Sequence, residues 1–175
     1  MAAKKIPMCP YCGSKNVTKV GGFYQCKSCS NDFGRTALTD DGKPMIEEVT
    51  GLRFRYGDSI SGSVHLRFAQ DEDSCVFEVY DANEGGKDKV AQVVPMKKWQ
   101  MLKKKLFDEL FINDWNREYI PVNDGQSALD NNSWEFSVIV NENEEQTYCG
   151  VDAYPVYWHG LLNLLDPYLD KLKQE

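Results

Sequence analysis

The chain has 175 residues, of which 42% are hydrophobic and 27% are charged, and its formal net charge is −7. This composition is typical of a folded globular protein and excludes a disordered chain or a collagen-like repeat. No run of about 18 apolar residues occurs, and the N-terminal residues lack the apolar segment of a secretion signal. We therefore expect a cytoplasmic protein with no membrane partner.

The charge is distributed unevenly along the chain. Residues 1–35 carry six basic side chains and one acidic side chain, which gives a net charge of +5. The remaining 140 residues carry 14 basic and 26 acidic side chains, which gives −12. This asymmetry indicates two modules with different surroundings.

Two C-x-x-C pairs lie in the basic segment, Cys9 with Cys12 and Cys26 with Cys29, and 13 residues separate the pairs. Two cysteines at this spacing direct both sulfurs to one ion from a tight turn, and a second such turn completes a set of four thiolate ligands. Thiolates in this number favour Zn²⁺ over hard cations. The alternative is a pair of disulfides in a secreted domain, which the missing secretion signal disfavours.

The segment resembles the zinc ribbons found at the ends of many bacterial and archaeal proteins, with CPYCG as the first cysteine turn and CKSC as the second. Gly13 stands where such a turn often needs a positive φ, whereas Ser30 replaces the glycine that commonly follows the second pair. Four cysteine ligands leave no open coordination position, so we expect one structural Zn²⁺ ion and no metal catalysis. About 35 residues cannot build a sufficient core, and the metal is expected to supply the folding energy.

Two interpretations of the ribbon surface are open. Its lysines, together with Phe23 and Tyr24, could contact a phosphate backbone and stack on bases. Alternatively, the lysines are solvated and the aromatic side chains cover the hairpin. We prefer the second interpretation because residues 36–175, with a net charge of −12, would repel a polyanion. The lysines concerned are Lys15, Lys19 and Lys27.

Residues 34–50 contain the turn sequence DDGKP and no apolar periodicity before it. We therefore predict a zinc ribbon at residues 1–35, a linker at residues 36–50 and a second domain, called the body below, at residues 51–175. A domain of this length is large enough for one hydrophobic core.

Beyond residue 50, apolar residues alternate with polar ones, the pattern of half-buried antiparallel strands. Strands are expected over residues 52–56, 64–68, 75–80 and 90–94, and a hairpin over residues 134–151. Helices are expected from Pro95 to about Ile112 and from Pro155 to about Leu172, with Pro167 kinking or dividing the second helix. This order predicts an α+β domain with an antiparallel sheet and two main helices on one face.

Two motifs of the body resemble those of a widespread set of uncharacterised bacterial domains. Residues 129–136, LDNNSWEF, are similar to the family pattern L-D-G-x-x-W, and residues 150–158, GVDAYPVYW, are similar to G-x-N-A-Y-P-x-x-W. Asn131 and Asp152 replace the glycine and the asparagine of these patterns. The resemblance covers residues 50–172 and implies a fold without a reaction. We expect Trp134 and Trp158 of the motifs to pack the hairpin against the last helix.

Four residues form a candidate site for an anion or an acidic partner segment. Arg53, Arg55, His65 and Arg67 are expected to project from the outward side of two paired strands, where guanidinium groups can receive carboxylates. Glu78 on the next strand could neutralise them instead as an ordinary cross-strand pair.

Cys149 and His159 lie close in the sequence and could form a cysteine–histidine nucleophile. We prefer a buried, inert thiol and a solvent-facing imidazole. The sequence contains no phosphate-binding loop, dinucleotide turn, zinc-protease motif or nucleophile elbow.

The expected function is that of a bacterial, non-enzymatic interaction or adaptor protein that uses a structural zinc ribbon and an α+β domain to bind a protein partner. A nucleic-acid-associated regulator that binds through the ribbon is the first alternative. A hydrolase or transferase that uses Cys149 and His159 is the second.

Overall fold

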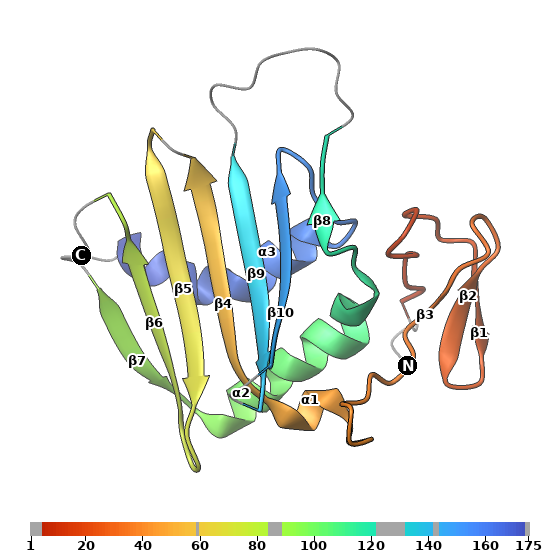
Figure 1. Ribbon diagram of the computed structural model, residues 1–175, viewed down its shortest axis with the longest axis horizontal. Helices are drawn as coiled ribbons and strands as arrows, with labels where there is room; N and C mark the ends of the chain where they lie inside the picture. The colour runs from red at the N-terminus through yellow and green to blue at the C-terminus, as the bar shows by residue number, and fades with distance from the viewer. Residues whose placement is uncertain (1–4, 59, 84–88, 122–131, 142–143, 174–175) are drawn as a thin grey trace.

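A computed structural model of the chain describes residues 5–58, 60–83, 89–121, 132–141 and 144–173. These residues form two sheets (Figure 1). The small sheet contains β1 (Val17–Val20), β2 (Phe23–Cys26) and β3 (Asp32–Phe33) in that order, all antiparallel. It holds the cysteine turns and lies beside the β8 end of the large sheet.

The large sheet has seven strands in the order β7-β6-β5-β4-β9-β10-β8. Each neighbouring pair is antiparallel except β10 with β8, which is parallel. Its strands are β4 (Val49–Asp58), β5 (Gly62–Gln70), β6 (Cys75–Asp81), β7 (Val90–Val94), β8 (Glu118–Tyr119), β9 (Ser133–Val140) and β10 (Glu144–Val151).

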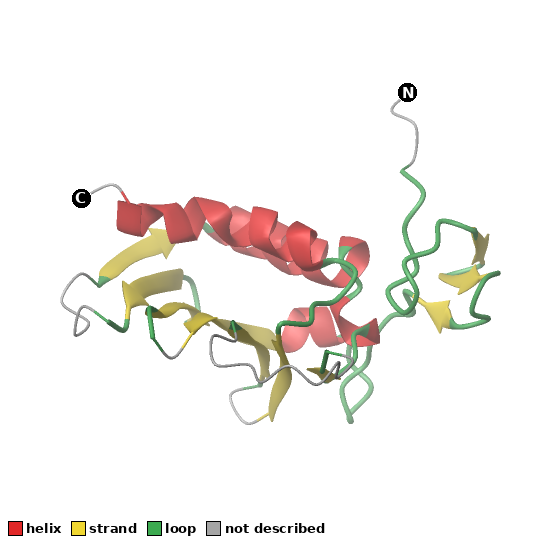
Figure 2. Cartoon of the chain, turned by 90° about the horizontal axis from the view of Figure 1, so that it is seen from above, coloured by secondary structure: helices red, strands yellow, loops and turns green. Residues whose placement is uncertain are grey.

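The two main helices, α2 (Met96–Lys104) and α3 (Trp158–Leu169), lie on the same side of the large sheet (Figure 2). The predicted α+β class, with a small cysteine-containing module and two main helices on one face of a largely antiparallel sheet, is confirmed. Shorter helical elements complete the chain: α1 (Met45–Glu48), the π-helical η1 (Lys105–Glu109) and the 3₁₀ turns η2 (Ile112–Asp114) and η3 (Asp170–Lys173).

Both predicted helices differ from the structure at their ends. The first helix leaves α geometry at Lys105 and continues as one π turn, in which Leu110 N–H donates to the Lys105 carbonyl at 2.9 Å. Such a turn adds a residue to the helical repeat and so shifts the direction of the side chains beyond it. The second helix begins at Trp158, three residues after Pro155, and runs through Pro167 to Leu169 without being divided.

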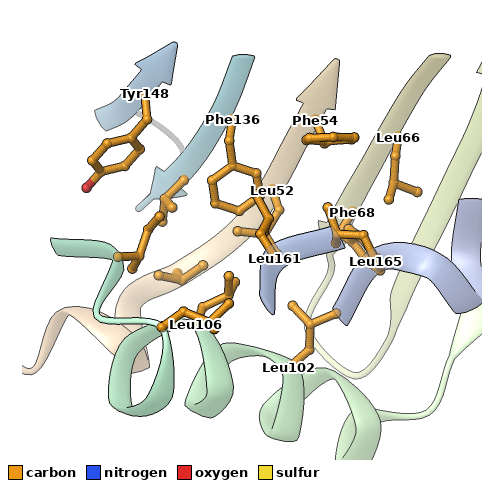
Figure 3. Packing of buried hydrophobic residues seen from close by; sticks show 14 of the residues in the cluster. Leu52, Phe54, Leu66, Phe68, Leu102, Leu106, Phe136, Tyr148, Leu161 and Leu165 are labelled. Carbon is orange, nitrogen blue, oxygen red and sulfur yellow. The ribbon is translucent and has the colours of Figure 1, made fainter. Parts of the chain in front are cut away.

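The inward side chains of the strands and the apolar sides of the helices form one buried cluster (Figure 3). Strands β4 and β5 contribute alternate residues, which is why the period-two pattern identified them. Trp134 and Trp158 pack with their ring centroids 4.9 Å apart, as predicted. The labelled members of the cluster are Leu52, Phe54, Leu66, Phe68, Leu102, Leu106, Phe136, Tyr148, Leu161 and Leu165.

Gly150 allows the Trp134 indole to lie close to β10. A Cβ at Gly150 would approach Trp134 Nε1 and the Ala153 carbonyl oxygen to 2.5 Å each. Trp134 Nε1–H donates to that same carbonyl at 2.8 Å, so the indole fixes the chain between β10 and α3. Asp152, in the same connection, has a φ of 47°, a conformation that asparagine and aspartate tolerate better than most residues. Close packing of the Trp134 indole therefore explains why the GVDAYP motif begins with glycine.

Lys103 is a core residue that the sequence patterns do not identify. Its side chain is 2% exposed, and its Nζ lies 3.4 Å from the Val49 carbonyl oxygen and 5.6 Å from the centre of the Trp99 ring. Burial lowers the pKa of Lys103. The residue follows Leu102 directly, so a pattern of apolar residues gives no signal for it.

Residues 36–50, predicted as a linker, contain a turn in which Thr39 N–H donates to the Lys43 carbonyl at 2.8 Å, followed by helix α1 and the first residues of β4. Residues 129–131 of the LDNNSWEF motif lie outside the described residues. Among the described residues, no helix has both the length and the apolar character that crossing a membrane requires.

Candidate functional site

The four sulfurs of the paired cysteines meet at one place in the ribbon. Sγ of Cys9 lies 3.6 Å from Sγ of Cys29, Sγ of Cys12 lies 3.6 Å from Sγ of Cys26, and all four sulfurs lie within 4.8 Å of one another. A metal with four bonds to sulfur of about 2.3 Å requires sulfur–sulfur edges of about 3.8 Å. The four cysteines are therefore positioned to bind one metal ion.

The two cysteine turns have matching backbone geometry. Cys26 Sγ accepts hydrogen bonds from the backbone N–H groups of Cys29 and Ser28, which lower the pKa of the Cys26 thiol to about 6. Cys9 has similar donors in the first turn, but burial is the larger effect and raises its pKa to about 12. Gly13 and Ser30 follow the two turns with φ values of 74° and 63°. Ser30 thus takes the left-handed conformation that glycine adopts without cost.

The cysteine cluster and the body share one buried aromatic cluster. Phe33 of the ribbon and Phe111 of the body meet edge to face, with ring centroids 5.1 Å apart. Tyr24 stacks on Phe33 at 5.4 Å, and Tyr157, next to α3, meets Phe111 at 5.7 Å. The same cluster buries the ligands Cys9 and Cys26. The ribbon therefore has little core of its own and completes it with side chains from the body.

Hydrogen bonds hold the same interface at two points. The Tyr157 hydroxyl accepts from Met8 N–H at 2.8 Å and donates to the Met8 carbonyl at 2.7 Å. Asp114 Oδ2 accepts from Gly34 N–H at 2.9 Å, and its Oδ1 accepts from the Tyr11 hydroxyl at 3.3 Å. Burial raises the pKa of Asp114, against the effect of these donors. Each bond joins residues at least 80 positions apart in the sequence.

Phe111 reaches the ribbon through an uncommon backbone conformation. It follows the π turn with φ 52° and ψ 47°, the left-handed region that usually belongs to glycine at a helix end. A non-glycine residue there costs of order 1–3 kcal/mol and persists only when its surroundings enforce it. The contacts of its ring with Phe33, Tyr24 and Tyr157 supply that enforcement.

On the remaining ribbon surface the lysines are exposed and the aromatic rings of the hairpin contact other side chains. Lys15, Lys19 and Lys27 are exposed. The Phe23 ring lies 3.5 Å below the guanidinium carbon of Arg35, and Tyr24 is occupied by the interface. The aromatic side chains of the hairpin therefore have partners within the protein.

The predicted arginine cluster lies on the face of the large sheet opposite the helices. In Figure 1 the strands stand in front of α3, so the view looks onto this face. Arg53 of β4 is directly opposite Arg67 of β5, and Arg55 is directly opposite His65. We call these four residues the arginine face.

Nearby carboxylates neutralise the positive charge of the arginine face only in part. Arg53 Nη1 lies 3.4 Å from Glu145 Oε1, an exposed pair. Glu78 is opposite Arg67 in the register, but its carboxylate lies 3.0 Å from Lys89 Nζ instead. In the described parts of the chain, no carboxylate forms an ion pair with the Arg55 or Arg67 guanidinium, although Arg55 Nη1 donates to the Ser133 hydroxyl at 3.4 Å.

His65 adds a flat, uncharged side chain to the arginine face. Its ring stacks on Tyr80 of β6 with the centroids 4.9 Å apart and an angle of 4° between the planes. Its Nε2 lies 2.9 Å from the Ser63 hydroxyl. Burial lowers the pKa of His65, and the neighbouring Arg55 lowers it further.

The structure does not bring Cys149 and His159 together. Cys149 faces outward between Glu135 and Glu118, its register neighbours, and lines an open hollow of about 470 Å³ beside β8. Burial raises the pKa of its thiol, and both glutamates raise it further. His159 is exposed on α3, which lies on the other side of the sheet. No hydrogen bond joins the two side chains within the part of the chain described.

The interface between ribbon and body is the functional feature that sequence reasoning missed. Phe111 extends the apolar side of its predicted helix, which places it in the body core, and no pattern singles out Tyr157 or Asp114. The one available signal is an aromatic residue near the predicted end of the helix, beside the polar segment that begins at Asn113.

Comparison of the chain with protein-family models, curated proteins and solved structures finds no match. The resemblance of the body to bacterial domains therefore stays a prediction. The cysteine cluster is consistent with a zinc ribbon on its geometry alone.

Proposed function

We propose that the protein is a non-enzymatic interaction protein, an adaptor, in which Zn²⁺ keeps the ribbon folded and the ribbon and body together present one surface to a protein partner. The observation that carries this proposal is the shared aromatic cluster, which buries the ligands Cys9 and Cys26 together with Phe111 and Tyr157 of the body. A surface that spans two modules binds more tightly when their relative position is fixed beforehand.

The metal in this proposal is Zn²⁺ in a structural role. Four thiolates form a soft, tetrahedral ligand set, which suits Zn²⁺ and disfavours Mg²⁺ and Ca²⁺. All four positions of the ion would be taken by protein sulfur, so neither water nor substrate could bind to it. Ions bound in this way stabilise a fold and do not catalyse.

A reaction centred on Cys149 finds little support. Its raised pKa favours the thiol over the nucleophilic thiolate, because burial and the carboxylates of Glu118 and Glu135 outweigh the opposite effect of Arg55. A Cys149 thiol that reacts with an alkylating reagent faster in the folded than in the denatured protein would revive the hydrolase or transferase alternative.

Nucleic-acid binding through the ribbon is the second alternative. Its lysines are exposed, but Arg35 lies over one face of the Phe23 ring and Tyr24 is used in the interface, so few aromatic faces are left for stacking on bases. This alternative predicts salt-dependent DNA or RNA binding that weakens when Lys15, Lys19 and Lys27 are replaced by glutamine.

We also propose a cytoplasmic location and the division of the chain into a ribbon, a linker and a body. Cysteines that bind metal must stay reduced, and a reducing compartment keeps them so, which favours the cytoplasm. The ribbon at residues 1–35, the linker at residues 36–50 and the body at residues 51–175 remain the proposed units.

Affinity capture with the zinc-loaded full chain tests the adaptor role, with the recovered partner then titrated by calorimetry. We expect Phe111→Ala to keep its zinc but to bind that partner more weakly, because the ribbon is no longer held against the body. Phe107→Ala, in the adjacent π turn and outside the shared cluster, is the matched control. A partner that binds the wild-type and Phe111→Ala proteins equally would contradict the joint surface.

A further inference from the structure

Two arginines stand side by side at the centre of the large sheet. Arg53 and Arg67 are register partners on β4 and β5, so their Cβ atoms lie about 5 Å apart on the exposed face. Like charges directly opposite each other destabilise a strand pair. The body carries a net charge of −9, so a shortage of acidic residues does not explain the arrangement.

The nearby carboxylates do not remove the repulsion between Arg53 and Arg67. Glu145 lies 3.4 Å from Arg53 in a pair whose side chains are 53% and 40% exposed, and such pairs contribute little. Glu78, the residue best placed to neutralise Arg67, lies against Lys89. Glu135 is opposite Arg55 in the register, but no ion pair joins them within the described residues, so the guanidinium groups of Arg55 and Arg67 keep hydrogen-bond donors open to an incoming anion.

The spacing of the face matches an extended chain. Arg53 and Arg55 are two positions apart on β4, which separates their side chains by about 6.6–6.8 Å, and β5 lies about 4.8 Å away. A peptide in extended conformation repeats its side chains on one face at the same interval of about 6.6–6.8 Å. Carboxylates at every second position of such a peptide could therefore meet Arg53 and Arg55 together, with Arg67 beside them.

We propose that the arginine face binds an extended, acidic segment of the partner protein, with its carboxylates on the guanidinium groups of Arg53, Arg55 and Arg67. This inference rests on the proposed adaptor function and names the chemistry of its partner. Guanidinium groups bind carboxylates through paired N–H donors, which gives direction as well as attraction. The stacked rings of His65 and Tyr80 flank the arginines with an uncharged surface.

An acidic peptide fits this face better than a nucleic acid. The cationic area is confined to the middle of the sheet, and Glu118, Glu135 and Glu145 lie on the strands toward the β8 edge. A polyanion that extended beyond the arginines would meet these carboxylates and the negative field of the body. A short peptide with a few alternating acids would meet only the two that adjoin the arginines, Glu135 opposite Arg55 and Glu145 beside Arg53.

Fluorescence anisotropy with a synthetic peptide tests the proposal on the zinc-loaded full chain. The probe carries glutamate at every second position and threonine between them. One comparison peptide has glutamine in place of glutamate, and another has the same composition with its glutamates grouped together. We expect the alternating acidic peptide to bind most tightly. Equal binding of the glutamine peptide, or tighter binding of an oligothymidylate, would overturn the proposal.

Variants locate the binding on the face. Arg53→Gln and Arg67→Gln should each weaken the peptide complex by about tenfold, because each removes charge-assisted hydrogen bonds. Lys104→Gln makes the same change of charge on an exposed residue of α2 and should have little effect. An equal loss with Lys104→Gln would show that only net charge matters and would reject the site.

The stability of the same variant gives a reading that does not depend on the peptide. Removing one of two opposed charges should raise the melting temperature of Arg67→Gln by about 1–3 °C. A lower melting temperature would mean that a carboxylate already neutralises Arg67, and this would contradict the proposal that the arginine is open to a partner.

Sedimentation of the protein without peptide tests whether a second copy of the chain occupies the arginine face. Self-association that Arg67→Gln abolishes would assign the face to a second copy of the chain and overturn the acidic partner segment. The outcome is independent of the test of adaptor function, since that test changes Phe111 and leaves the arginine face intact.

Discussion

The ribbon and the body bury their side chains in different ways. In the ribbon, Cys9, Cys26 and Phe33 form a small buried group that is completed by Phe111 of the body. In the body, two helices and the inward side of the large sheet form a continuous cluster whose buried members include no residue of the ribbon. A small module can thus rely on a metal and a borrowed aromatic ring where a larger domain relies on apolar area.

Removing the metal should have the largest effect, because it should unfold the ribbon and leave the body folded. Cys26→Ser is expected to lose bound zinc and unfold the ribbon, because metal binding supplies about 10–16 kcal/mol to folds of this kind. The body should keep its amide spectrum and a cooperative melting transition. Elemental analysis and two-dimensional NMR measure the two effects, and Cys149→Ser is the control that should retain one zinc per chain.

A ribbon that keeps its amide signals in metal-free Cys26→Ser would show that its fold does not depend on zinc. Two disulfides in a metal-free wild-type protein would likewise contradict the metal site.

Phe111→Ala should separate the two modules without unfolding either one. Truncation of a buried phenylalanine costs about 3–5 kcal/mol, and here the loss falls on the contact between ribbon and body. We expect zinc content to remain unchanged while the ribbon tumbles faster than the body in NMR relaxation measurements. Equal tumbling of both modules would mean that the hydrogen bonds of Tyr157 and Asp114 suffice.

Ser30→Gly should strengthen the ribbon alone. Ser30 has a φ of 63°, and glycine removes the steric cost of that conformation, about 0.5–1 kcal/mol after its larger unfolded-state entropy is included. Competition with a zinc chelator measures the gain. Ser28→Gly, in the same turn but without a positive φ, is the matched control and should weaken zinc retention.

The smallest expected effect concerns the body and its pH dependence. The pKa of His65 is lower in the folded chain than its usual value of 6.5, so the unfolded chain binds the proton more readily. The contribution of neutral His65 to the free energy of unfolding is therefore fully present above pH 6.5. It declines as the pH falls from 6.5 through the lowered pKa. NMR titration of the His65 ring gives the pKa, and His65→Gln should flatten this part of the stability curve. A folded-state pKa above 6.5 would reverse the sign.

The sequence predicted those parts of the molecule that depend on local repetition. Period-two apolar residues identified β4, β5, β6 and β9, and the cysteine spacing identified the metal-binding set, since each signal lies within a short segment. The outward positions of Arg53 and Arg67 followed from the same alternation.

The unpredicted parts depend on residues far apart in the chain. The contact of Phe111 with Phe33 requires a π turn and a left-handed backbone, neither of which has a reliable sequence signal. Burial of Lys103 depends on the Val49 carbonyl, 54 positions away. The parallel pairing of the two-residue strand β8 with β10 is too short to show a periodic pattern.

The pairing of β4 with β9 has a consequence for the order of folding during synthesis. Val49 pairs with Val140 and Gly57 with Ser133, so the middle of the large sheet cannot close until most of the body has been made. The four cysteines and strands β1–β3 all lie within residues 9–33, so the metal could bind long before that. A nascent chain would then carry a metal-bound ribbon whose small core still lacks Phe111 and Tyr157, so docking of the ribbon on the body would be one of the last steps of folding.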